Sequence, residues 1–161
     1  MVNRLVTGME SSYWKMDQYT GIKVIRTPFR IPNCEGYAMH AQEEALYRSS
    51  KWKEAQRQFG IMQELAKRKR APAPVEIAII VDDRGTGTGV GTFFYPAIIM
   101  EHINFTSQSH CKDWRTEKAF TKFLRILGKK YSVQDTHPDN VIWSQDKKRF
   151  MLLDMGGVSK L

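Results

Sequence analysis

The stretch that decides the fold is Val133–Trp143, VQDTHPDNVIW, together with Leu152–Gly156, LLDMG. The first segment contains Asp135 and, five residues later, Asn140. An apolar run follows Asn140, and a second apolar run leads into Asp154. Two short apolar runs separated by a polar turn predict a β-hairpin. Such a hairpin would bring Asn140 and Asp154 together at one end of a rigid support.

This order of polar residues suits phosphoryl transfer from ATP. That reaction needs one Asp, here Asp135, to accept or orient the proton of the attacking hydroxyl. It also needs an Asn and a second Asp, here Asn140 and Asp154, to hold the Mg²⁺ that neutralises charge on the phosphates. The alternative interpretation of Asp135 and Asn140 is that each caps a turn.

The segment resembles the catalytic region of the protein-kinase-like superfamily. The catalytic loop of that family runs H-R-D-x-x-x-x-N and its metal loop runs D-F-G. Asp135 matches the catalytic Asp, Asn140 the Asn, and Asp154 the first residue of D-F-G. The loop D-x-H-P-x-N, which contains His137, is most similar to aminoglycoside and choline kinases and to some bacteriophage and bacterial kinases. The resemblance implies ATP and Mg²⁺ as cofactors, with His137 beside the γ-phosphate.

Earlier segments resemble other kinase motifs in the same order. Lys23, in GIKVI, resembles the lysine of the V-A-I-K strand, which contacts the α- and β-phosphates. In the helical stretch that follows, Glu44 is preferred to Glu43 as the glutamate that would pair with Lys23. Gly8 matches the middle glycine of the glycine-rich loop. Taken singly, Lys23 also fits an exposed strand position, and the glutamates fit a solvated helix face.

The segment IIMEHI, residues 98–103, resembles the last strand of a kinase N-lobe running into the hinge. The resemblance implies that Met100 is the gatekeeper. It also implies that the backbone of Glu101, His102 and Ile103 meets the adenine.

Composition and periodicity predict an α+β protein, with strands before, between and after two helices. With the resemblance, the expected fold is a bilobal protein-kinase-like fold with a truncated C-lobe. The N-lobe is expected at 1–103 and a shortened C-lobe at 104–161. The predicted strands are 3–7, 12–16, 20–26, 75–81, 93–101, 141–143 and 149–153, and the predicted helices are 38–69, with a possible division at Gly60, and 116–130.

The 161 residues contain no apolar run near the roughly 18–20 residues that a membrane span needs. The first residues lack the apolar core of a signal peptide. Two cysteines are too few for a disulfide framework. We therefore expect no membrane contact and a cytoplasmic location, in the host cytoplasm if the protein is viral or a secreted effector.

The net charge of +8 favours acidic partners. The excess is concentrated in residues 51–70, which end in the basic run Lys67–Arg70. Such a run is usually a solvated helix end. Nucleic acid is a possible partner of this run but is not favoured over an acidic protein, because no zinc finger, RNA-recognition signature or heptad array accompanies it.

Three functions follow from these observations. The first is a minimal Ser/Thr protein kinase of phage or bacterial-effector type. The second is a catalytically weak, kinase-like interaction protein that binds an acidic partner through its basic residues. The third is a small-molecule kinase, suggested by His137. It ranks last because only seven residues follow Asp154, and such enzymes build their substrate pocket from later helices.

Overall fold

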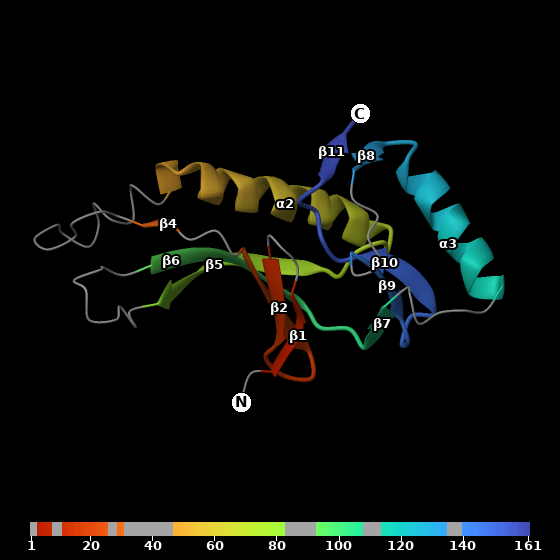
Figure 1. Ribbon diagram of the computed structural model, residues 1–161, viewed down its shortest axis with the longest axis horizontal. Coiled ribbons are helices and arrows are strands. Elements are labelled where there is room, and N and C mark those ends of the chain that lie inside the picture. The colour runs from red at the N-terminus through yellow and green to blue at the C-terminus, as the bar shows by residue number, and fades with distance from the viewer. Residues whose placement is uncertain are drawn as a thin grey trace, which may run out of the picture.

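A computed structural model describes residues 3–7, 11–25, 29–30, 47–82, 93–107, 114–134 and 140–161. The described chain is a mixed α+β structure, as the sequence predicts, with a large antiparallel sheet, two small sheets and two helices. Figure 1 shows an elongated molecule in which helix α2 runs along the large sheet, while the small sheets and α3 gather at one end.

Six strands form the large sheet. The order is β1-β2-β3-β6, with β5 on the far side of β6 and the short β4 pairing with β6 beyond the end of β3. All of these pairs are antiparallel, and the predicted strands 75–81 and 93–101 pair with each other as β5 and β6. The bounds are β1 Asn3–Thr7, β2 Ser11–Lys15, β3 Thr20–Ile25, β4 Phe29–Arg30, β5 Pro74–Asp82 and β6 Phe93–Glu101.

Helix α2, Ser50–Lys67, packs against β5 and β6. It begins at Ser49, whose side-chain oxygen accepts a hydrogen bond from the Trp52 N–H and so caps the first turn. The possible division at Gly60 was wrong, because the helix continues through that residue. A single glycine costs a helix only about 1 kcal/mol, which tertiary packing readily offsets.

The C-terminal end of α2 closes in a Schellman motif. The N–H of Lys69 donates to Ala66 O and that of Arg70 donates to Leu65 O, with Lys69 at a φ of 56°. The connection to β5 also joins distant parts of the chain. Arg70 O accepts the Leu152 N–H at 2.7 Å, and Ala73 O accepts the Glu101 N–H at 2.8 Å.

The remaining strands form two small sheets beside α3, Trp114–Leu127. One has the order β10-β9-β7, and the other pairs β11 with β8. The predicted hairpin of β9 and β10 is confirmed, whereas β4, β7, β8 and β11 were not foreseen because two or three residues carry no readable alternation. The bounds are β7 Phe105–Ser107, β8 Tyr131–Val133, β9 Val141–Ser144, β10 Arg149–Leu152 and β11 Val158–Lys160.

One apolar core runs through the described chain. It joins Met62 and Leu65 of α2 to Met100 of β6 and to Met151 of β10. Helix α3 adds Phe123 and Leu127, which lie four residues apart and therefore share one face of the helix. No described helix has the combination of length and apolarity that a membrane crossing requires. The division into lobes at residue 103 stays a prediction.

Candidate functional site

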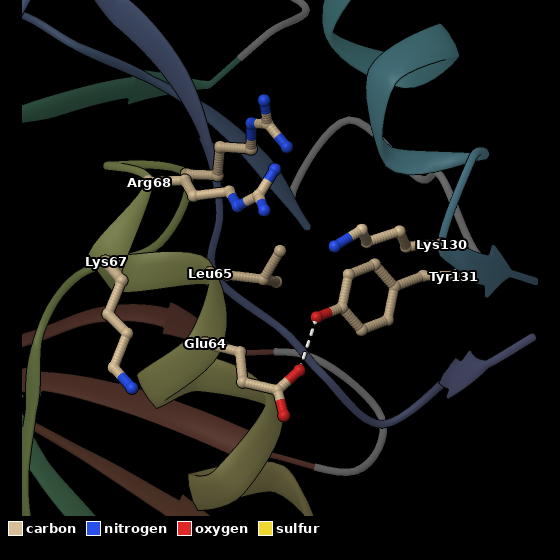
Figure 2. Close-up of a pocket in the computed structure, with 7 residues that line it drawn as sticks. Glu64, Leu65, Lys67, Arg68, Lys130 and Tyr131 are labelled. Carbon is tan, nitrogen blue, oxygen red and sulfur yellow. Dashed lines mark hydrogen bonds between the residues drawn. The ribbon is translucent and has the colours of Figure 1, made fainter.

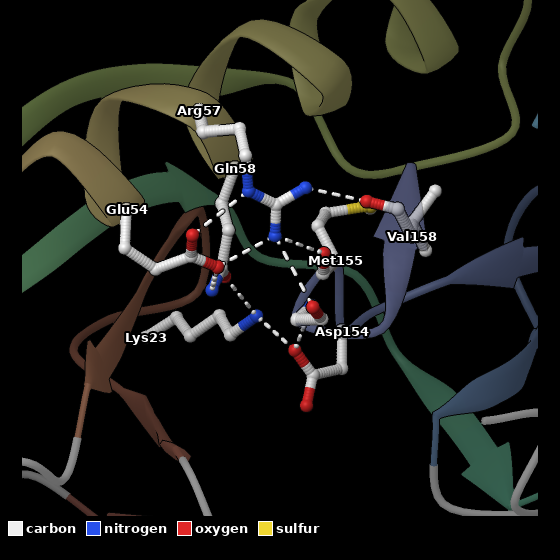
Figure 3. Close-up of polar contacts among 8 residues, drawn as sticks. Lys23, Glu54, Arg57, Gln58, Asp154, Met155 and Val158 are labelled. Carbon is white, nitrogen blue, oxygen red and sulfur yellow. Dashed lines mark hydrogen bonds and ion pairs between the residues drawn. The ribbon is translucent and has the colours of Figure 1, made fainter. Parts of the chain in front are cut away.

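The centre of the candidate site is an ion pair between Lys23 and Asp154, which lie 131 positions apart in the chain. Lys23 Nζ lies 2.6 Å from Asp154 Oδ1. The side chain of Lys23 is only 2% exposed, and that of Asp154 is 20% exposed. A buried ammonium requires such compensation, because removing it from water is costly. Figure 3 shows Lys23 of β3 pointing toward Asp154, which follows β10.

Helix α2 supplies the second partner of Lys23. Nζ donates to Gln58 Oε1 at 2.9 Å, and Gln58 Nε2 donates in turn to Glu54 Oε1 at 3.0 Å. Gln58 is therefore a neutral relay between the ammonium and a carboxylate one helical turn earlier. Lys23, Glu54, Arg57 and Asp154 together carry two charges of each sign, so the cluster is balanced.

Arg57 connects α2 to the chain that follows Asp154. Its Nη2 donates to Met155 O and to Gly156 O, each at 3.1 Å, and its Nη1 donates to Val158 O. Glu54 holds the other side of the guanidinium, at 2.8 Å from Nε and 2.5 Å from Nη2 (Figure 3). Neighbouring residues of one helix thus fix both Lys23 and the loop of Asp154.

Charge within this cluster shifts two titrations. Hydrogen bonds from Arg57 lower the pKa of Glu54 against the opposing effect of burial, and Gln58 and the charge of Lys23 add to the lowering. The hydrogen bond to Glu54 raises the pKa of Arg57. Both groups are therefore ionised near neutral pH, and the clamp around the Asp154 loop is charge-assisted.

The β9–β10 hairpin brings Asn140 and Asp154 to the same end, as the sequence predicts. Val141 pairs with Leu152, and the Leu153 N–H donates to Asn140 O at 2.8 Å. Asp154 Oδ1 also accepts the Gly156 N–H at 3.0 Å, which orients the carboxylate. An amide oxygen and a carboxylate oxygen are ligand types that Mg²⁺ accepts.

Four predicted site residues lie outside the described residues: Gly8, Glu44, Asp135 and His137. Their proposed roles stay predictions. The chain reaches the segment 135–139 from Gln134, whose N–H donates to Gly157 O at 2.9 Å, and leaves it at Asn140. Both flanks are therefore bonded to the stretch that contains Asp154.

The predicted hinge follows β6. Met100 is fully buried, and Ile103 belongs to the apolar core. The Glu101 carboxylate accepts the Ala73 N–H and pairs with Lys147, so its side chain braces the turn after α2. The His102 N–H donates to Tyr19 O at 2.8 Å. The structure thus places Met100 and Glu101 at the end of β6, and His102 and Ile103 in the connection from β6 to β7.

The imidazole of His102 faces the large sheet. Its Nδ1 lies 2.8 Å from the hydroxyl of Tyr13, and the two rings stack with centroids 6.0 Å apart. Burial, and next the charge of Lys15, lower the pKa of His102 against the opposing effects of Asp146, Asn104 and Asp17. Burial, helped by Glu101, raises the pKa of Tyr13. Both rings are therefore neutral near pH 7.

A second polar site lies at the far end of α2. A cavity of about 360 Å³ is lined by Lys67, Arg68, Arg70 and Lys130, with Glu64, Leu65 and Tyr131. Figure 2 shows Arg68 and Lys130 extending toward the same space, whereas Lys67 points away. Burial, and next the charge of Arg68, lower the pKa of Arg70. This basic cavity is lined by three of the four residues of the basic run Lys67–Arg70.

The sequence did not reveal Glu54, Arg57 and Gln58. They lie in the segment that composition marked only as basic, and their alignment with Lys23 depends on how α2 crosses the sheet. One signal was present. Gln58 occupies the position between Ala55 and Ile61 in the buried stripe of α2, where a polar side chain needs a partner.

Within the described part of the chain, no group of three or more His, Cys, Asp and Glu side chains is placed to hold a metal ion. No protein-family model matches the chain, and no curated protein matches it. The identity of the site therefore rests on its own chemistry.

Proposed function

We propose that this chain is an ATP·Mg²⁺-dependent phosphotransferase of minimal size, acting on Ser or Thr hydroxyls of a protein. The observation that carries the proposal is the 2.6 Å contact of Lys23 Nζ with Asp154 Oδ1. The resemblance predicts Lys23 as the phosphate lysine and Asp154 as a metal ligand, and the side chains of these two residues are in contact. A chance pairing of residues 131 apart is a poor explanation for this agreement.

Each residue then has a defined task. Lys23 would contact the α- and β-phosphates, and Asp154 with Asn140 would hold Mg²⁺, which supplies charge neutralisation. Gln58 keeps Lys23 in place without adding a competing charge. Asp135 would orient the attacking hydroxyl and take its proton, and His137 would donate a hydrogen bond to the γ-phosphate. Met100 would be the gatekeeper beside the adenine, and the backbone of Glu101–Ile103 would contact the adenine.

Thermal denaturation tests the binding half of the proposal. With Mg·ATP at about 100 times its dissociation constant, the free energy of unfolding should rise by about 2.7 kcal/mol. Asp154→Ala should abolish that shift, while Glu76→Gln, which changes an exposed carboxylate on β5, should keep it. If neither millimolar Mg·ATP nor millimolar Mg·tripolyphosphate, which carries the phosphate chain without a base, stabilises the wild type, the proposal is refuted.

Transfer of labelled γ-phosphate tests the chemical half. Asp135→Asn should leave nucleotide binding intact and lower transfer about 10²–10⁴-fold, the contribution of a positioned acid–base group. If Asp135 only caps a turn, the variant should instead lose about 1 kcal/mol of stability with no selective loss of transfer. Label on protein hydroxyls would support the proposal, and label on small alcohols alone would favour a small-molecule kinase.

The basic cavity favours a second candidate, a non-catalytic protein that binds an acidic partner. Glu64 is engaged by Tyr131 at 2.7 Å and by Lys160 at 2.5 Å, so it offers little neutralisation to Arg68, Arg70 and Lys130. A poly-glutamate peptide should then bind with strong salt dependence. The double variant R68E/R70E should abolish binding, and the control K122E/R125E, on the exposed face of α3, should retain it.

A further inference from the structure

The face of β3 between Lys23 and the hinge is covered by the ring of Tyr13. Tyr13 and Lys23 are direct partners across β2 and β3, and directly opposed residues project to the same face. Gly21, two residues before Lys23, shares that face. A Cβ atom added to Gly21 would lie 2.1 Å from Tyr13 Oη and 2.6 Å from both Cε2 and Cζ. The phenol therefore lies directly on the Gly21 backbone.

Tyr13 is fixed in this place from several sides. Its side chain is only 3% exposed and belongs to the central core. Its hydroxyl meets His102 Nδ1 at 2.8 Å, and its ring lies 5.8 Å from that of Phe105. His102 and Phe105 come from the hinge and from β7, so Tyr13 closes the space between the sheet and the hinge.

The register of β3 and β6 places Gly21 between Lys23 and the predicted hinge. Gly21 pairs with Met100, and Thr20 pairs with Glu101, so the hinge begins one residue beyond Gly21. Lys23 lies about 7 Å from Gly21 along the strand. A nucleotide with its phosphates at Lys23 and its base against the backbone of Glu101–Ile103 must therefore cross the face of Gly21. The Tyr13 ring already occupies that place.

We propose that Tyr13 is the specificity-determining residue of this site, because its ring occupies the position of the donor nucleobase. The inference rests on the proposed function and deepens it. A polyphosphate·Mg²⁺ ligand reaches Lys23, Asn140 and Asp154 without moving Tyr13, whereas a nucleoside triphosphate must displace the ring. Since only the displaced state accepts the base, the apparent affinity for ATP is reduced by the fraction of time that Tyr13 spends in that state.

Binding of two probes to three proteins tests this inference. The probes are Mg·ATP and Mg·tripolyphosphate, and the proteins are wild type, Tyr13→Ala and the control Phe150→Leu, which trims a buried ring on β10. Tyr13→Ala should tighten Mg·ATP at least about tenfold, equivalent to about 1.4 kcal/mol, and change Mg·tripolyphosphate less than about twofold. The control Phe150→Leu should leave the dissociation constants of both probes unchanged. Tyr13→Leu, which keeps an apolar side chain, serves if Tyr13→Ala does not fold.

A measurement on the wild type needs no variant. Nuclear Overhauser contacts between the Tyr13 ring and the Gly21 α-protons should vanish at saturating Mg·ATP and persist with Mg·tripolyphosphate. Their persistence with ATP bound, or an unchanged ATP-to-tripolyphosphate ratio in Tyr13→Ala, would overturn this inference and leave the phosphotransferase intact. Failure of both probes to bind any of the proteins would overturn the inference and the proposed function together.

Discussion

The two ends of one strand face, at Lys23 and at Gly21, are filled in opposite ways. At Lys23 the contacts are charges and hydrogen bonds, from Asp154 and Gln58. At Gly21 the contact is an aromatic ring packed on bare backbone. In the proposed function, phosphate oxygens and a metal ion would replace the charged partners of Lys23, whereas a base could enter only after the buried ring had moved. The first end is held by charge and hydrogen bonds, and the second is closed by packing.

The largest expected effect tests the charged end. Asp154→Ala leaves the Lys23 ammonium buried without its carboxylate, so the free energy of unfolding should fall by about 3 kcal/mol. We expect the double variant K23M/D154A to recover much of this loss, because it removes the uncompensated charge. Urea denaturation of the single and double variants measures both values. A double variant no more stable than Asp154→Ala would contradict a charge-based role.

The next effect tests the packed end. Gly21→Ala introduces a Cβ within 3 Å of the Tyr13 ring, and overpacking of this kind costs about 2 kcal/mol. In a Tyr13→Ala background the same substitution should cost less than about 0.5 kcal/mol, because the opposing atoms are gone. Denaturation of the four proteins gives the coupling energy. Equal costs in both backgrounds would mean that the ring and Gly21 are not in contact.

A smaller effect shows how far the charged end extends. Arg57→Ala removes the donors that hold Met155, Gly156 and Val158, and we expect a loss of about 1.5 kcal/mol. The matched control is Arg149→Ala, since Arg149 is exposed and its guanidinium donates to the nearby Lys147 O. It should cost less than about 0.5 kcal/mol. If the free energy of unfolding falls by similar amounts in the two variants, the charged end does not extend beyond Lys23 and its direct partners.

The smallest effect is a pH dependence of the packed end. Because the folded protein lowers the pKa of His102, the unfolded chain binds the proton more readily. The contribution of neutral His102 to the free energy of unfolding is therefore fully present above about pH 6.5, the ordinary pKa of His, and declines as the pH falls below that value. The difference in urea midpoint between pH 7.5 and 5.5 should shrink in His102→Gln. An unchanged difference would assign the effect to other histidines.

The sequence predicted most of the large sheet and the β9–β10 hairpin, because strands of four or more residues have a readable alternation. It also predicted that Asn140 and Asp154 meet, since a hairpin fixes the distance between its ends. It did not predict Gln58 as a partner of Lys23, because that contact depends on the angle at which α2 crosses the sheet. Nor did it predict Tyr13 over Gly21, since cross-strand register decides which ring lies on which glycine.

The turn between α2 and β5 has a dynamic consequence. Arg70 O and Ala73 O accept the amides of Leu152 and Glu101, which belong to β10 and to the end of β6. Neither amide can exchange with deuterium unless this turn opens, so we expect the two to exchange at similar rates although they are far apart in the chain. A ligand that displaces the C-terminal end of α2 would then change the exchange rates of both amides together. The turn would thus couple the opening of the end of β6 to the opening of the β9–β10 hairpin.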